Sequence, residues 1–157
     1  MAGYSVERSI TVNAPPHRVH GMVDDFHNWT LWSPWEELDP DLRRTYTGPD
    51  KGVGAHYAWA GNRKAGEGSM EIKGSTPEGI DITVEFLKPF HAINQTRLSF
   101  EPSGSGTNVR WVMTGEHKGL MGVFGRMMSM DRLIGKDFEK GLTRLKAVVD
   151  ESDAPST

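Results

Sequence analysis

Apolar and polar residues alternate along much of the chain, a pattern typical of strands with one buried face. The first such stretch runs from Ser5 to Val12. It ends at Ala14-Pro15-Pro16, and proline suits the first turn of a helix that would place Val19, Met22 and Val23 inward. We therefore expect one strand followed by a short helix.

After residue 39 the alternation returns between short turns rich in Gly, Pro, Asn and Ser, and it predicts about six short strands. Connections this short predict an antiparallel meander. The clearest strands are Val53–Trp59, Ser69–Lys73, Ile80–Leu87, Thr96–Phe100 and Asn108–Gly115. Their apolar face carries Tyr57, Trp59, Met70, Ile72, Ile80, Ile82, Val84, Phe86, Leu98, Phe100, Val109, Trp111 and Met113.

From about Leu120 to Val149 the apolar period changes to that of a helix. A helix of about thirty residues is ~45 Å long, enough to cross a whole sheet. Residues 151–157 are small and polar, and we expect a flexible tail there. The apolar stripe contains Leu120, Phe124, Met127, Met128, Ile134, Phe138, Leu142, Leu145 and Val149. These elements predict an α+β fold in which a curved antiparallel sheet grips the long helix.

A third pattern is a cluster of tryptophans between the first helix and the meander. Trp29, Trp32 and Trp35 are three of the five tryptophans, and Ser33-Pro34 separates the last two. Because a long helix tolerates such a proline poorly, we expect a second short helix or a loop here. Three large rings must be buried against protein core or against a bound molecule.

The composition and net charge limit which molecules the chain is expected to bind. A chain of 157 residues without cysteine can form one domain and has neither disulfides nor thiolate metal sites. A net charge of -3 offers no basic surface for nucleic acid. No apolar run approaches the ~18 residues that span a bilayer, and no leader pattern precedes the first strand, so we expect a cytoplasmic location.

Five segments together resemble one protein family: Asn13–Pro16, Trp32–Glu36, Gly66–Gly68, Glu85–Phe90 and Ile134–Leu142. They resemble the polyketide cyclase/dehydrase type 2 family, part of the START and birch-pollen-allergen-like (SRPBCC) superfamily. The resemblance implies a helix-grip fold with about seven strands and two short helices after the first strand. It implies a single ligand-binding domain over residues 1–150, with an elongated cavity between sheet and long helix.

We expect the inner face and the start of the long helix to line that cavity. Methionine adapts to guests of different shape, and five of the eight methionines lie in the last strand or the first turns of the long helix. The alternative for each of these residues is ordinary core. The candidate ligand-binding residues are Trp32, Trp35, Tyr57, Trp59, Met70, Phe86, Trp111, Met113, Phe124, Met127, Met128 and Asp131.

Asp131 is the polar member of this set. It lies in the middle of the apolar stripe, where an unpaired carboxylate would be costly. Arg8 has the strand parity of Val6 and Ile10, so it points inward and is a candidate partner. The pair could be a structural ion pair or a polar anchor for a ligand.

Other chemistry is weakly indicated. His17 and His20 are three residues apart on the first helix, with Asp24, Asp25 and His27 after them, but these polar groups are expected to be solvated. Glu36 and Glu37 are adjacent carboxylates that we also expect in water. We therefore predict no catalytic residues, no metal and no cofactor.

Three function classes follow. The first is binding, transport or sensing of a small hydrophobic molecule, aromatic or lipid-like, in the cavity. The second is a cyclase, dehydrase or aromatase acting on a polyketide-like substrate, which needs a placed acid or base. The third is a protein-interaction module resembling ribosome-associated toxin-like members, which would expose the tryptophans. Monomer and homodimer both remain open.

Overall fold

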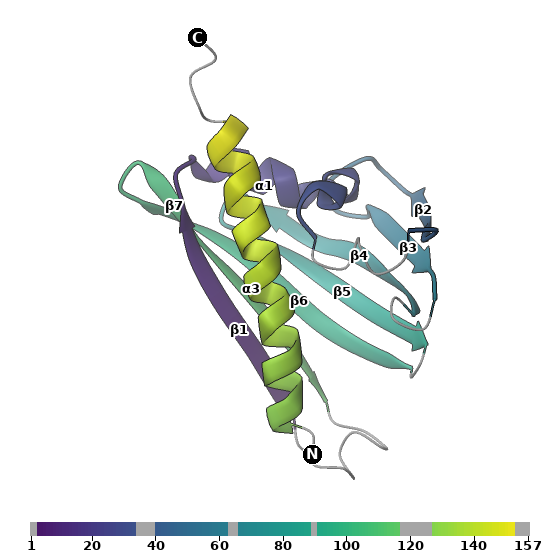
Figure 1. Cartoon of the computed structure of the whole chain (residues 1–157). Helices are drawn as coiled ribbons and strands as arrows, with labels where there is room; N and C mark the ends of the chain where they lie inside the picture. Colours follow the sequence, from purple (N-terminus) through teal and green to yellow (C-terminus); the bar gives the residue numbers. More distant parts are fainter. Residues whose placement is uncertain (1–2, 34–39, 63–65, 89–90, 117–126, 153–157) are drawn as a thin grey trace.

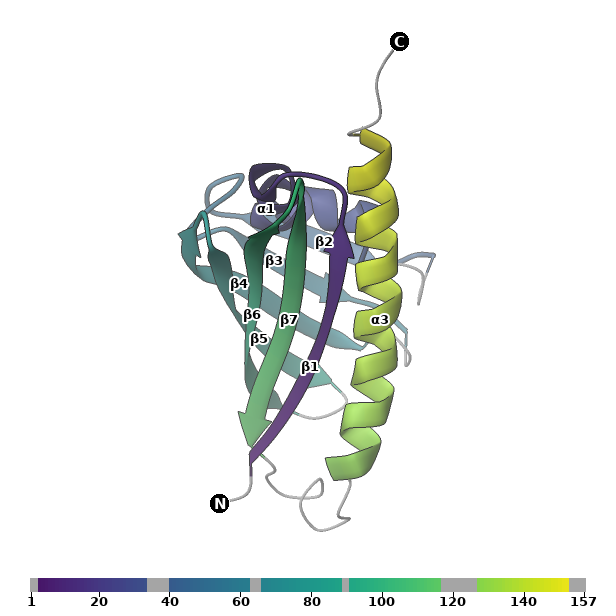
Figure 2. The ribbon, with the colours of Figure 1, turned by 90° about the vertical axis from the view of Figure 1, so that its left-hand side faces the viewer.

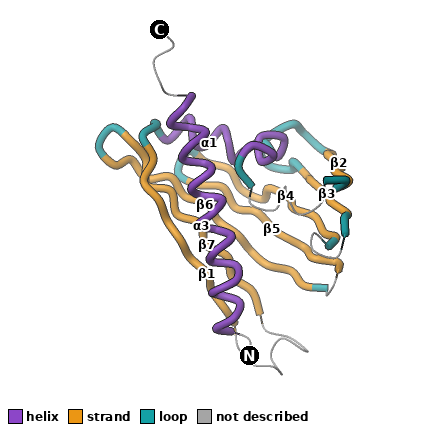
Figure 3. The backbone as a smooth tube through the Cα atoms, viewed as in Figure 1, coloured by secondary structure: helices purple, strands orange, loops and turns teal. Residues whose placement is uncertain are grey.

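The computed structural model describes residues 3–33, 40–62, 66–88, 91–116 and 127–152 (Figure 1). One strand and two short helices precede a run of six strands and a long C-terminal helix (Figure 3). The elements are β1 (Gly3–Val12), α1 (Pro16–Asp24), η1 (Phe26–Leu31), β2 (Arg43–Thr47), β3 (His56–Ala60), β4 (Glu67–Thr76), β5 (Gly79–Lys88), β6 (Ala92–Ser103), β7 (Gly106–Glu116) and α3 (Met127–Ser152).

The strands form one antiparallel sheet in the order β1-β7-β6-β5-β4-β3-β2. Neighbours in sequence are neighbours in the sheet, except that β1 pairs with β7. The register brings inner-face residues into rows across the strands; one row contains Val6, Met113, Thr96, Ile82 and Ile72. Register shifts in the β4–β5 pair fall beside Gly68 and Gly74, and such irregularities bend a sheet.

The helices cover the inner face of this curved sheet. Helix α3 runs along β1, as Figures 1 and 2 show, and also contacts α1 and η1. Its apolar stripe is buried at Phe138, Leu142, Leu145 and Val149. Helix α1 adds Val19 and Val23 to the same core, so the predicted grip of sheet on helix is confirmed.

Two strand predictions need correction. The stretch Val53–Trp59 is strand only from His56, because Gly52 and Gly54 adopt φ values of +80° and +96° in turns before it. β2 was absent from the predicted set of clearest strands. It lies at the edge of the sheet and four of its five residues are exposed, so it has no alternating apolar face.

The long helix is confirmed from Met127 onward, and its predicted start near Leu120 lies outside the described residues. Among the helices that the structure describes, none combines the length and hydropathy that a bilayer crossing requires.

Candidate functional site

The inner face of the sheet has two ends, the α1 end and the far end. The α1 end is the part under α1, η1 and the C-terminal half of α3, with Val12, Val109 and Phe100. The far end is the part of the inner face on strands β3 to β6 that comprises Trp59, Met70, Val84, Phe86, Asn94 and Thr96. The candidate site residues are divided between these ends.

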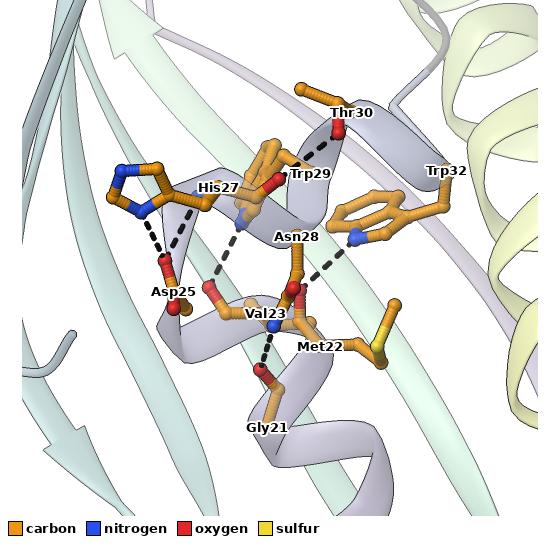
Figure 4. A network of polar contacts seen from close by, with 9 residues as sticks. All are labelled: Gly21, Met22, Val23, Asp25, His27, Asn28, Trp29, Thr30 and Trp32. Atoms are coloured by element: carbon orange, nitrogen blue, oxygen red, sulfur yellow. Dashed lines mark hydrogen bonds and ion pairs between the residues drawn. The ribbon is translucent and has the colours of Figure 1, made fainter. Parts of the chain in front are cut away.

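The tryptophans of η1 hold the α1 end together (Figure 4). The last four carbonyls of a helix have no partner within it. Here the Trp29 indole N–H donates to the carbonyl of Val23 at 2.8 Å, and the Trp32 indole N–H donates to that of Met22 at 3.1 Å. Side-chain donors therefore fix η1 against the end of α1.

The other two carbonyls at the end of α1 accept hydrogen bonds in the same way. The Asn28 side-chain amide donates to the carbonyl of Gly21 at 3.1 Å, and the backbone N–H of Gly52 donates to that of Asp24 at 3.1 Å. Because each of the four carbonyls has a partner, η1 and the β2–β3 turn are positioned by α1.

The rings of this segment also pack on the sheet and on α3. Trp32 is 0% exposed, and its ring centroid lies 5.5 Å from that of Trp111 on β7. Trp111 in turn stacks on Phe138 of α3, with centroids 4.0 Å apart and ring planes 5° from parallel. Trp32 and Trp111, both predicted to bind ligand, thus lie at the centre of the folded core.

Aromatic contacts continue from there to the far end. Phe26 links Trp29 to Tyr57, and Tyr57 stacks on Trp59 with centroids 6.0 Å apart. Trp59 meets Phe86 edge to face at 5.9 Å. A continuous row of rings therefore crosses the inner face from α3 to β5.

At the far end this row is only partly covered. Trp59 and Phe86 are half-buried, while Met70 beside them is buried. The Trp59 ring lies over Gly68, where an added Cβ would be 2.7 Å from Trp59 Cη2. Because Gly68 has no side chain, the Trp59 indole can lie against the sheet at this position.

Two buried polar side chains stand among these apolar residues, and neither was predicted. Thr96 is 4% exposed, and within the described part of the chain its hydroxyl has no hydrogen-bond partner. Asn94 is also buried, two residues earlier on the same face of β6. The signal was present for Thr96, since it shares strand parity with Leu98 and Phe100.

The polar residues of α1 were predicted to lie in water, and two of them do not. Asp24 is buried, and its carboxylate accepts the hydroxyl proton of Ser75 at 2.7 Å. His20 Nε2 lies 3.2 Å from the same Ser75 oxygen. His20 and Asp24 therefore join α1 to the end of β4, while His17 is exposed as predicted.

This chain of contacts does not form a nucleophilic triad. In such a triad the histidine accepts the serine proton and the carboxylate orients the histidine. Here Ser75 donates to Asp24, so its oxygen is left to accept from His20, and the histidine is not placed as its base. The contacts are therefore structural.

Arg8 points toward α3, as its strand parity predicted, and contacts that helix at Glu139 and Gly135. Its Nε donates to Glu139 Oε2 at 2.8 Å. Its guanidinium also lies against Gly135, where any Cβ would collide with it. The predicted pairing of Arg8 with Asp131 stays a prediction, because the side chain of Asp131 lies outside the described residues.

The remaining predicted site residues are buried on the inner face, border the far end, or lie outside the described residues. Tyr57, Met70 and Met113 are buried on the inner face, and Trp59 and Phe86 border the far end. Trp35 and Phe124 lie outside the described residues, as do the side chains of Met127 and Met128. Because Trp29 and Trp32 are buried, neither can form the exposed patch that a protein-interaction module would need.

Electrostatics act mainly at the α1 end and on the surface. Asp150 of α3 accepts the backbone N–H of Asn13 at 2.8 Å and Lys146 Nζ at 2.7 Å. Partial burial alone would raise the pKa of Asp150, but these two donors outweigh it and hold the pKa below its ordinary value. No group of three His, Asp or Glu side chains within the described ranges could hold a metal ion.

Comparison with known proteins agrees with this architecture. Residues 4–150 match the family described as polyketide cyclase/dehydrase and lipid transport. The chain belongs to this family. No curated protein matches it. The predicted family and helix-grip fold are thereby confirmed.

Solved structures of the same fold are distant in sequence. A Thermus thermophilus protein is 17% identical with a TM-score of 0.69, covering 96% of this chain and 99% of its own. A Nitrosospira multiformis protein is 23% identical with a TM-score of 0.67, over 94% and 98%. Ara h 8.0201 is 13% identical with a TM-score of 0.62, over 94% and 98%. These similarities concern the fold.

Proposed function

We propose that this chain binds a small hydrophobic molecule between the far end of the sheet and the N-terminal half of α3. The observation that carries the proposal is the half-buried pair Trp59 and Phe86, at the end of a row of rings that is otherwise core. Large aromatic side chains stabilise a fold by full burial. Trp59 and Phe86 lie on the inner face but are only half-buried, which fits a surface that a bound molecule would cover.

The family gives independent support, because its description includes lipid transport as well as cyclase and dehydrase activity. An enzyme would need an acid or base aimed at the guest. The buried polar groups of the far end are neutral, at Asn94 and Thr96, and Arg44, opposite Trp59 on β2, is exposed. Binding for transport or sensing needs only apolar surface and neutral polar groups. We therefore propose binding and not catalysis.

The proposal is tested with N-phenyl-1-naphthylamine, a neutral apolar probe whose fluorescence rises on burial. We expect a Kd on the order of micromolar, with quenching of tryptophan emission. Phe86→Ala should weaken binding about tenfold or more, the scale of one lost aromatic contact. Ile93→Ala is the control, because Ile93 is exposed on the outer face of the same sheet. Equal binding by the two variants would contradict this site.

A further inference from the structure

The buried hydroxyl of Thr96 carries information about the ligand beyond its hydrophobicity. A buried polar atom without a partner is destabilising, and valine has nearly the same shape as threonine without the hydroxyl. Thr96 Oγ1 nevertheless has no partner among the described residues, at a position 4% exposed. Within the described part of the chain, no contact favours a hydroxyl over an apolar group at this position.

The surroundings of Thr96 show which face of the sheet its side chain lies on. Its cross-strand partners are Met113 on β7 and Ile82 on β5, and both are buried on the inner face. Leu98 follows on the same side of β6. The hydroxyl is therefore on the face that the proposed ligand would touch, among groups that cannot form a strong hydrogen bond with it.

The same surroundings restrict the charge of a partner. An ion buried without a counter-charge is strongly destabilised. The described residues paired with Thr96 are uncharged, and Asn94, next along the inner face, is neutral as well. A threonine hydroxyl can donate one hydrogen bond and accept others. A neutral oxygen of a hydroxyl or carbonyl group fits this site better than a carboxylate or an ammonium.

We propose that Thr96 is the hydrogen-bonding anchor for the ligand, which is an apolar or aromatic molecule carrying one neutral hydroxyl or carbonyl oxygen. This inference rests on the proposed function and narrows it to a chemical class. The apolar body lies against Trp59 and Phe86, and the oxygen meets Thr96 Oγ1. The anchor orients the guest, while the rings supply most of the contact area.

The experiment uses two probes of the same shape, 2-naphthol and 2-methylnaphthalene, in which a hydroxyl replaces a methyl group. Their affinities are measured by displacement of N-phenyl-1-naphthylamine from the wild type, Thr96→Val and Thr96→Ser. Thr96→Val should weaken 2-naphthol binding about two- to tenfold, the scale of one hydrogen bond, and leave 2-methylnaphthalene unchanged or tighter. Thr96→Ser keeps the hydroxyl and should keep the preference for 2-naphthol.

Thr83→Val is the matched control, because the Thr83 hydroxyl lies on the outer face and donates to Gln95 Oε1. It should change neither affinity. The Tm of ligand-free Thr96→Val should equal or exceed that of the wild type, since no described partner is lost.

Three results would overturn the anchor. Thr96→Val could change both affinities equally or neither, which leaves the hydrophobic site intact but without this hydrogen bond. A fall in the Tm of ligand-free Thr96→Val would show that the hydroxyl serves the fold. If neither probe displaces N-phenyl-1-naphthylamine or binds directly, the hydrophobic site itself is wrong, and the anchor with it.

Discussion

The α1 end and the far end of the inner face differ in how their side chains are packed and hydrogen-bonded. At the α1 end, three side-chain donors join the helices to the sheet and to each other: Thr107 donates to the carbonyl of Ala14 at 2.7 Å, and Trp32 and Trp29 donate to the end of α1. At the far end, the buried Thr96 hydroxyl has no partner among the described residues. The aromatic rings follow the same division, fully buried at one end and half-buried at the other.

This difference separates the part of the inner face that holds the fold from the part that is suited to binding. Satisfied donors and closely packed rings fix the angle between α1, η1 and the sheet, and such a region tolerates little change. A surface that takes a guest needs apolar area and a hydrogen-bonding group left available. Because the α1 end stabilises the fold, the far end can keep aromatic side chains that are only half-buried.

The largest expected effect comes from removing a ring at each end. Trp32→Ala should lower the free energy of unfolding by about 3 to 5 kcal/mol, because it leaves a cavity and an unpartnered carbonyl at Met22. Trp59→Ala should cost only about 1 to 2 kcal/mol, because its ring is half-buried, but should weaken probe binding. Urea unfolding and N-phenyl-1-naphthylamine titration measure the two quantities.

Trp32→Phe is the control, since it keeps an aromatic ring and removes the indole N–H that Met22 accepts. Its cost should be about 1 to 2 kcal/mol, the value of the lost hydrogen bond. A Trp59→Ala loss as large as that of Trp32→Ala would show that both ends are equally close-packed. The division of the inner face would then be wrong.

A smaller effect tests how closely β1 and α3 approach between the two ends. Gly135→Ala should be about 1 to 2 kcal/mol less stable than helix propensity alone would make it, because the new methyl group displaces the Arg8 guanidinium, the flexible end of that side chain, from its contact with α3. Helix propensity alone would favour alanine by about 1 kcal/mol. Chemical unfolding of the variant, alone and combined with Arg8→Ala, measures the cost of displacing Arg8, and adding Gly135→Ala to Arg8→Ala should show the full gain from helix propensity.

Gly21→Ala provides a control for that propensity term. Gly21 lies in α1, and an added Cβ there would meet nothing within 4 Å. Its replacement should stabilise by about 0.5 to 1 kcal/mol. If Gly135→Ala stabilises as much as Gly21→Ala, the contact between Arg8 and α3 is looser than described.

The sequence predicted the elements whose side chains are buried on one face. Alternation identified the inner face of β4 to β7, and the 3.6-residue period placed Phe138, Leu142 and Leu145 correctly, because burial and periodicity have the same cause. Six strands were predicted after residue 39, but β2 was not located, because an exposed edge strand needs no apolar face. Arg8 was placed on the correct side of β1 by parity alone.

The candidate site was predictable only in part, because hydrogen-bond partners depend on how elements meet. Trp32 was identified as a large ring that needs burial, but its bond to Met22 follows from the angle between α1 and η1. Asp24 was assigned to water since nothing in the local sequence points to Ser75, 51 residues away. Glu139 was not considered for Arg8, because it is 60% exposed at the edge of the helix.

The smallest expected effect concerns how the α1 end is closed by the last turns of α3. Asp150 joins α3 to Asn13, just after β1, and its lowered pKa means that the folded state favours the carboxylate. A group with a lowered folded pKa stabilises fully above its unfolded pKa, and this stabilisation is lost as pH falls through the folded pKa. Asp150→Asn should therefore cost about 1 kcal/mol near pH 7, a value kept small by the partial exposure of the side chain.

Below about pH 3 the wild type and Asp150→Asn should approach equal stability. Asp150 is then protonated in the unfolded state and becomes increasingly protonated in the folded state, so it is neutral like the asparagine. Urea unfolding across this range measures the difference. Lys146→Met is the control: it removes one donor to Asp150 and leaves the Asn13 bond, so its loss should be smaller. A difference between wild type and Asp150→Asn that does not change with pH would mean that the carboxylate charge plays no part in holding α3. The α1 end would then be held by its packing and its neutral hydrogen bonds, and it would differ from the far end in those alone.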